Sequence, residues 1–193
     1  MTRSLFRLGA FLFLLVAVVS CVSDDSPELK NFSGVQLFDE NGNPLGCYGD
    51  CGDDWGNIPL SDNELDYLNF TDFLVVPDST GPFNPSAPRV FPVPMATSGE
   101  LLMLLGSERP TKFKMAIVSQ DGEVRAFVAT IILSTNSVLA LDNAFFADVP
   151  RGEVVRMYYA YFDTMDNPIY TGYGDLGICP FDPPITDVSP CFE

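Results

Sequence analysis

Residues 112–133, KFKMAIVSQDGEVRAFVATIIL, decide the fold. Two segments rich in β-branched and aromatic residues, 112–119 and 123–133, flank the turn Gln120-Asp121-Gly122. An Asp-Gly pair accepts the positive φ that a tight hairpin turn requires, and Val, Ile, Phe and Thr favour strands. The stretch therefore predicts a β-hairpin, and we expect an all-β domain around it.

Other segments repeat this strand pattern at roughly the spacing of a β-sandwich. Each is short, rich in β-branched or aromatic side chains, and bounded by turn residues. They are residues 34–38, 70–76, 137–141, 153–162 and 168–173. Side chains alternate between the faces of a strand, so Tyr158 falls on one face and Tyr159 with Tyr161 on the other. We expect a single sandwich-like domain over residues 34–193.

Two stretches predict loops, and a short helix is predicted between them. Residues 46–59 (GCYGDCGDDWGNIP) are dense in Gly and Asp without an apolar period, which predicts an ordered loop pinned by cysteines. Residues 77–94 contain six prolines, which predicts an extended surface loop where the domain could be subdivided. Ser61-x-x-Glu64 predicts a capping box. We therefore expect long loops and at most one or two short helices.

Two stretches combine a strand with a turn that begins at an aspartate. They are residues 35–46 (VQLFDENGNPLG) and 149–167 (VPRGEVVRMYYAYFDTMDN). Both resemble Ig-like or transthyretin-like β-sandwich modules of surface proteins. The resemblance implies a fold class, and it carries no functional residues over to this chain.

The amino terminus has the pattern of an export signal. Residues 1–7 carry two arginines, and the apolar run 8–19 (LGAFLFLLVAVV) leads to Ser20-Cys21. This run is shorter than the roughly 20 apolar residues that a membrane-spanning helix needs, and acidic residues follow within a few positions. We therefore expect residues 1–20 to be a cleaved signal peptide.

The tetrapeptide Val18-Val19-Ser20-Cys21 resembles the lipobox of bacterial lipoproteins. The resemblance implies acylation of Cys21, with palmitate among the chains, and anchoring in the outer membrane of the cell envelope, facing the periplasm or the cell surface. An ordinary secretory signal is the alternative. Residues 22–28 (VSDDSPE) resemble the acidic export tag of surface lipoproteins from Bacteroidota, although a solvated tether over residues 21–33 accounts for them equally well.

Charge and composition exclude several classes of function. The chain has 26 acidic and 10 basic residues, a net charge of -16, and no histidine. Removal of residues 1–20, which contain Arg3 and Arg7 but no acid, would leave -18. Such a field repels phosphate backbones, so nucleic acid is not an expected partner. Without histidine we expect no enzyme, with an Asp- and Glu-dependent hydrolase as the alternative.

If Cys21 is acylated, four cysteines remain in the mature chain. Their even number and an oxidising compartment predict two disulfides. Proximity along the chain favours Cys47 with Cys51 and Cys179 with Cys191. The alternative joins the first cysteine loop to the carboxyl-terminal tail and would restrict the unfolded chain more strongly.

The cysteine-containing loop of residues 46–59 also holds the candidate binding residues. Asp50, Asp53 and Asp54 offer the oxygen ligands that Ca²⁺ prefers, with a solvated acidic loop as the alternative. Trp55 could stack against sugar rings together with several tyrosines, with core packing as the alternative. These tyrosines are Tyr158, Tyr159, Tyr161, Tyr170 and Tyr173. We expect a binding or assembly role toward an outer-membrane protein or a glycan, and no cofactor other than candidate calcium.

Overall fold

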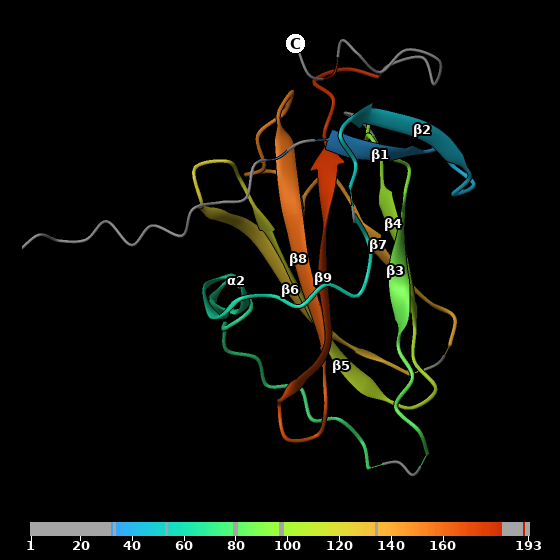
Figure 1. Ribbon diagram of the computed structural model, residues 1–193, viewed down its shortest axis with the longest axis vertical. Helices are drawn as coiled ribbons and strands as arrows, with labels where there is room; N and C mark the ends of the chain where they lie inside the picture. Colours follow the sequence, from blue (N-terminus) through green and yellow to red (C-terminus); the bar gives the residue numbers. More distant parts are fainter. Residues whose placement is uncertain are drawn as a thin grey trace, which may run out of the picture.

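A computed structural model describes residues 32, 34–52, 54–78, 81–96, 99–133, 135–182 and 191. The expected signal peptide, Cys21 and Asp53 lie outside these residues, as does the expected tether apart from Phe32. The described residues form nine strands and one short helix (Figure 1). None of the helical structure in these ranges is long and apolar enough to cross a membrane.

Two antiparallel sheets pack face to face, as the sequence predicts for an all-β sandwich (Figure 1). One sheet has the strand order β6-β5-β8-β9 and the other β3-β4-β7. The hairpin predicted from residues 112–133 is confirmed as β5 and β6, with Lys114 opposite Ala129. The strands are β3 Ser86–Phe91, β4 Leu101–Gly106, β5 Thr111–Val118, β6 Val124–Ile132, β7 Ser137–Leu141, β8 Val154–Phe162 and β9 Pro168–Gly177.

A separate hairpin, β1 Gly34–Phe38 and β2 Pro44–Gly49, closes the side of the sandwich where β9 and β3 form the sheet edges. Phe38 and Val93 exchange two backbone hydrogen bonds, at 3.0 and 3.1 Å. Two residues further on, the N–H of Met95 donates to the carbonyl of Gly177 at 2.9 Å. The segment after β3 therefore links the hairpin to β9.

The main core lies between the two sheets and takes every second side chain of their strands. Tyr159 and Tyr161 point into this core, whereas Tyr158 lies on the other face of β8, which confirms the predicted alternation. Several large core side chains have less than 2% of their surface exposed. They include Met103, Leu105, Phe113, Met115, Ile117 and Tyr159.

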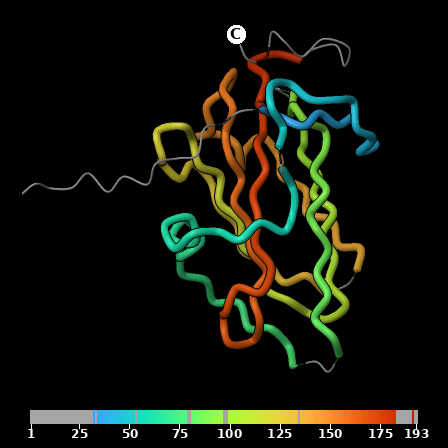
Figure 2. Tube along the Cα trace, viewed as in Figure 1, coloured from blue at the N-terminus to red at the C-terminus, as the bar shows by residue number. Residues whose placement is uncertain are grey.

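Residues 54–78, which we call the wrap, run along the edge of β9 and then cross the outer face of the β6-β5-β8-β9 sheet (Figure 2). The wrap contains helix α2, Asp62–Asp66, and the predicted capping box between Ser61 and Glu64 is present. Leu68 packs on a second apolar cluster that the sheet presents on this face. As a result, the central strands β5 and β8 are covered on both faces. The cluster contains Ala116, Val118, Tyr158, Ala160 and Phe162.

The predicted strand at residues 70–76 is wrong. This segment belongs to the wrap and has no ladder partner. Side chains hold it instead, because Asp72 forms ion pairs with Lys112 at 3.1 Å and with Lys114 at 2.7 Å. Phe73 and Val75 are 94% and 82% exposed, so the apolar pattern of this segment does not reflect burial.

Two stretches predicted to be loops contain strands. The first part of residues 46–59 belongs to β2, because the carboxylate of Asp39 accepts the backbone N–H groups of Asn41 and Asn43 and turns the chain back along β1. Residues 77–94 include β3, an edge strand, where Pro88 is tolerated because one row of backbone groups needs no ladder partner. Strand β4 had no predicted counterpart, since its continuous apolar run lacks a period.

Candidate functional site

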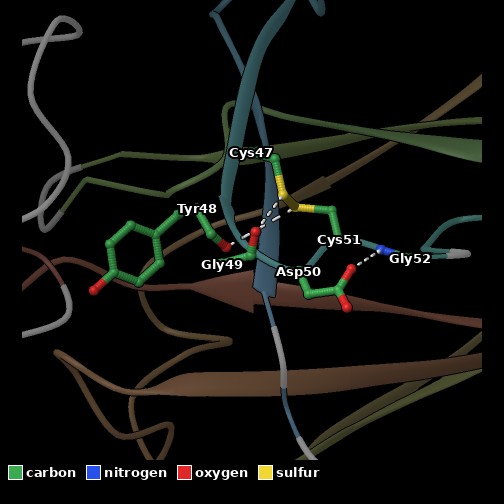
Figure 3. Close-up of a disulfide and its surroundings, with 6 residues drawn as sticks. All are labelled: Cys47, Tyr48, Gly49, Asp50, Cys51 and Gly52. Atoms are coloured by element: carbon green, nitrogen blue, oxygen red, sulfur yellow. Dashed lines mark hydrogen bonds between the residues drawn. A yellow bond between two sulfur atoms is a disulfide. The ribbon is translucent and has the colours of Figure 1, made fainter.

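The loop after β2 is closed by a disulfide between Cys47 and Cys51, whose Cα atoms are 6.0 Å apart (Figure 3). The carboxylate of Asp50, in this loop, accepts a hydrogen bond from the backbone N–H of Gly52, directly after the loop. Cys179 and Cys191 form the second pair, with Cα atoms 4.6 Å apart. The first disulfide thus fixes the chain just before the two residues that form the candidate site.

Trp55 begins a segment that runs along the edge of β9. Its backbone N–H donates to the carbonyl of Tyr173 at 2.9 Å, and the N–H of Ile58 donates to the carbonyl of Thr171 at the same distance. The backbone of Trp55 has a φ of 63°, a left-handed conformation that costs a non-glycine residue on the order of 1–3 kcal/mol. These contacts hold Trp55 in that conformation.

The indole ring of Trp55 is held in place by contacts with β8 and β9. It stacks on Tyr159 with ring centroids 6.4 Å apart and an angle of 5° between the planes. The ring also occupies the space above Gly174, where an added Cβ would lie 2.2 Å from an indole carbon. Only 8% of Trp55 is exposed, and its buried Nε1 has no hydrogen-bond partner among the described residues.

The carboxyl group of Asp54 is the second unusual group of the site. Burial raises its pKa to about 7, and the negative charge of Asp175 adds to the effect, while the backbone N–H of Asp175 and the charge of Arg156 oppose it. Its Oδ2 atom is buried without a hydrogen-bond partner in the described part of the chain. Asp54 can therefore exchange a proton near neutral pH.

A buried ion pair lies beside Asp54 on β8 and β9. The guanidinium of Arg156 donates to both carboxylate oxygens of Asp175, at 2.7 and 2.9 Å, and lies between the rings of Phe32 and Tyr173. Burial alone would lower the pKa of Arg156, but the carboxylate of Asp175 raises it. Burial raises the pKa of Asp175, and the hydrogen bonds and charge of Arg156 oppose that shift. Asp175 is thus committed to Arg156.

Asp54 and Trp55 line a cleft of about 670 Å³ on the side of the sandwich closed by the β1–β2 hairpin. Strand β3 forms the opposite wall and brings Arg89 and Val90 to the cleft. Other polar side chains on its lining are Gln36, Ser86, Thr135 and Asn136. Asp54 is the single carboxyl group that the described residues place on this lining, so the two-carboxylate arrangement of a glycoside hydrolase is not provided here.

Three of the five tyrosines suggested for a sugar-stacking platform lie in the packed clusters, whereas Tyr170 and Tyr173 are partly exposed. Tyr158, Tyr159 and Tyr161 are at most 1% exposed and belong to the packed clusters. Burial raises the pKa of Tyr158 to about 12. Trp55 does line the cleft, but Tyr159 stacks on its ring.

The three aspartates suggested for calcium do not form one described cluster. Asp50 is exposed in the disulfide loop, Asp54 lies at the cleft, and Asp53 lies outside the described residues. No group of three or more potential metal ligands is found within the described ranges. Calcium binding remains a hypothesis.

Sequence reasoning missed Gln36, Arg89 and Asn136 as residues of this cleft. They come from β1, β3 and the turn before β7, and only the fold brings them together. Of these three residues, only Arg89 had a signal in the sequence, because it is an arginine within a proline-rich stretch.

No protein-family model, curated protein or solved structure matches the chain. Its function therefore has to be inferred from the cleft, the surface and the amino-terminal sequence.

Proposed function

We propose that this protein is a lipid-anchored lipoprotein of the cell envelope that binds a neutral, hydroxyl-rich ligand, of the chemical class of glycans, in the cleft beside Trp55. The anchor rests on the amino-terminal sequence around Cys21. The binding role rests on the cleft, and one observation carries it. Asp54 and Trp55, adjacent on its lining, each keep a buried polar atom without a partner among the described residues.

Unpaired polar atoms are costly in a folded protein. A buried donor or acceptor without a partner costs about 1–3 kcal/mol. A ligand that enters the cleft can offset this cost if it accepts from the indole N–H and donates to the carboxyl oxygen after a small local adjustment. A hydroxyl group can do both, which makes a polyol or sugar the best chemical match.

Charge favours a neutral ligand over an anionic one. The chain has a net charge of -16, so an anion approaches against the field of the whole protein. Arg89, Gln36 and Asn136 add planar hydrogen-bonding groups to the lining. A volume of about 670 Å³ lies within the range of roughly 300–1,000 Å³ that is usual for small-ligand sites.

Binding can be tested on the full chain, purified from membranes in a mild detergent, with an array of neutral oligosaccharides. Trp55 is the single tryptophan of the chain, so its fluorescence should change when a bound sugar reaches the cleft. Trp55→Phe removes the indole N–H but keeps an aromatic ring. We expect it to weaken binding by about 2- to 13-fold, the equivalent of one hydrogen bond of roughly 0.5–1.5 kcal/mol.

The matched control is Phe73→Ala, which changes an aromatic residue that is 94% exposed outside the cleft lining. This variant should bind as tightly as the wild type. An array without signal above background, or equal losses in the two variants, would contradict the proposal.

The anchor is tested separately by metabolic labelling with a fatty acid. The wild type should incorporate the label, and Cys21→Ala should not. Continued labelling of Cys21→Ala would remove the lipoprotein assignment without affecting the proposal for the cleft.

A further inference from the structure

The three most exposed large apolar side chains among the described residues are those of Phe73, Val75 and Met165. Phe73 and Val75 lie in the wrap and are 94% and 82% exposed, and Met165 lies in the turn between β8 and β9 and is 77% exposed. We call these three residues the apolar tip. Both segments lie at the end of the sandwich that is remote from the β1–β2 hairpin (Figure 1). None of the three residues lines the cleft.

One lysine holds the two segments of the apolar tip together. The ammonium group of Lys112 pairs with the carboxylate of Asp72 at 3.1 Å and with that of Asp166 at 2.6 Å. Asp72 directly precedes Phe73, and Asp166 directly follows Met165. The wrap and the turn therefore present their exposed apolar side chains close to each other.

The backbone of both segments is fixed in a way that directs these side chains outward. In the wrap, residues 72, 74 and 76 are half-buried whereas residues 73 and 75 are exposed, which is the alternation of an extended chain lying on a surface. In the turn, the carboxylate of Asp163 accepts the backbone N–H groups of Met165 and Asn167, both at 2.8 Å. A group of apolar side chains held outward by such contacts indicates an interaction surface.

Charges around the apolar tip are balanced, although the chain as a whole is strongly acidic. Residues 73–77 (FLVVP) contain no charged residue. Three acids on the two segments interact with three bases. The acids are Asp72, Asp163 and Asp166, and the bases are Lys112, Lys114 and Arg109. This end can therefore approach neutral, zwitterionic lipid headgroups, whereas a net charge of -16 repels anionic ones.

The length of the amino-terminal chain indicates which surface meets the apolar tip. The ring of Phe32 lies 4.7 Å from the guanidinium carbon of Arg156, near the start of β8. Lys112 lies opposite Phe162, six residues further along β8, or roughly 20 Å at about 3.3 Å per residue. Cys21 precedes Phe32 by 11 residues, which span about 40 Å at most. Acyl chains on Cys21 can therefore enter a bilayer that also touches the apolar tip.

We propose that the apolar tip rests on the bilayer in which Cys21 is anchored and inserts its three side chains at the boundary between neutral headgroups and acyl chains. The inference rests on the lipid anchor of the proposed function and adds a second point of attachment to it. An acylated tether alone leaves the domain free to rotate above the membrane. A second, apolar contact gives the domain one orientation on the bilayer.

Fluorescence quenching by lipid tests this contact. The full acylated chain is reconstituted into phosphatidylcholine vesicles whose acyl chains carry bromine, which quenches tryptophan at short range. Trp55 is the single tryptophan of the chain and is 8% exposed, so it gives a constant background. Phe73→Trp should add an emission that is blue-shifted and strongly quenched by the brominated lipid. Leu45→Trp, at an exposed position of β2, is the matched control, and its added emission should not be quenched.

Flotation of the same vesicles separates this proposal from the anchor on which it rests. The wild type and both tryptophan variants keep Cys21 and should float with the lipid. Chains that float while Phe73→Trp is quenched no more than Leu45→Trp would overturn the contact of the apolar tip and leave the anchor in place. Chains that do not float would remove the anchor and this proposal together.

A second set of variants tests whether the apolar tip acts as a unit. Met165→Trp should be quenched by brominated lipid as Phe73→Trp is. Adding Phe73→Asp and Val75→Asp to this reporter should abolish its quenching, because a carboxylate resists transfer out of water. Circular dichroism shows whether this variant keeps the fold, and if it does not, the comparison of Phe73→Trp with Leu45→Trp decides alone. Quenching that persists in a folded variant with both aspartates would overturn the proposal.

Discussion

At the scale of single residues, the cleft depends on two neighbours that tolerate unfavourable states. Trp55 adopts a left-handed backbone conformation, and Asp54 holds a carboxyl group where burial raises its pKa to about 7. Both are held by β9, through the backbone of Tyr173 and Asp175 and through the space above Gly174. The backbone of Trp55 and the buried carboxyl group of Asp54 thus lower the stability of the fold at the position where a bound ligand could restore it.

Asp54→Asn should change how stability depends on pH. The folded-state pKa of Asp54, about 7, lies above the ordinary value of 3.8, so its contribution to stability is complete at low pH and is lost as the pH rises from about 4 to 7. The asparagine side chain stays neutral at every pH. In urea unfolding we expect the variant to be more stable than the wild type at pH 8 by on the order of 2 kcal/mol, allowing for partial solvent screening.

This gain should largely disappear near pH 4, where the folded wild type is also neutral at this position. A variant that is less stable than the wild type at pH 8 would mean that the carboxylate has a stabilising partner.

Gly174→Ala should disturb Trp55 directly. A Cβ at this position would lie 2.2 Å from the indole ring, so the ring or β9 must move. We expect a loss of about 1–3 kcal/mol of stability and a shift of the tryptophan emission as the ring becomes more exposed. Gly99→Ala is the milder comparison, because its added Cβ would meet the backbone of Ala96 at 3.3 Å, which requires a shift of only a few tenths of an ångström. Unchanged emission from Gly174→Ala would contradict the packing described for Trp55.

At the scale of elements, the wrap shows that a segment can be fixed without regular secondary structure. Leu68, in the turn after its helix, packs on one part of the sheet face, and Asp72 attaches another part to Lys112 and Lys114. Burial alone would raise the pKa of Asp72, but the two ammonium groups and the N–H of Leu74 lower it to about 2. The wrap is therefore attached by charge where it leaves the apolar cluster.

Asp72→Asn should loosen the wrap. Removing the carboxylate leaves two largely buried lysines short of a partner, and we expect a loss of about 3 kcal/mol at pH 7, reduced by the contact that Lys112 keeps with Asp166. Because the folded pKa of Asp72 lies below its ordinary value of 3.8, its contribution is present above that pH and is lost as the pH falls toward 2.

Chemical unfolding at several pH values measures this loss, and the variant and the wild type should converge at low pH. Asp66→Asn, an exposed position of the same wrap, is the control and should have little effect. A pH-independent difference would show that packing, not charge, holds the segment.

An element can be predicted when the residues that determine it lie close together in the sequence. The β5–β6 hairpin was predictable because its turn and its alternation lie within one stretch, and the capping box of α2 because Ser61 and Glu64 are three residues apart. The segment around Phe73 has the composition of a strand, but its place depends on lysines some forty residues away. Arg89 reaches the cleft only through the pairing of distant strands.

At the scale of the whole molecule, the two sides of the sandwich differ. One side is closed by the β1–β2 hairpin, whereas on the other β6 and β7 are edge strands among the described residues, and the cleft extends from the hairpin to the turn before β7. Cys191 is buried against the domain and joined to Cys179, directly after β9, so the carboxyl-terminal end is attached close to the closed side.

The two disulfides should differ in their contribution to stability. The Cys179–Cys191 bond spans a sequence separation of 12 and the Cys47–Cys51 bond one of 4. From loop length alone, replacing Cys179 and Cys191 by alanine should cost about 3 kcal/mol of stability, and replacing Cys47 and Cys51 about 2 kcal/mol. Loss of two buried sulfur atoms widens the difference, because both Cys179 and Cys191 are fully buried. Equal shifts in the urea midpoint for the two double variants would contradict this order.

The coverage of β5 and β8 on both faces has a consequence for hydrogen exchange. Each of these strands is also paired along both edges, so their amide protons can reach solvent only when the sheet itself comes apart. Their exchange rates in deuterated water should report the global opening of the domain. Amides of residues 70–76, which have no ladder partner, should exchange through local detachment at much lower free energy, so a single exchange experiment would separate the two motions.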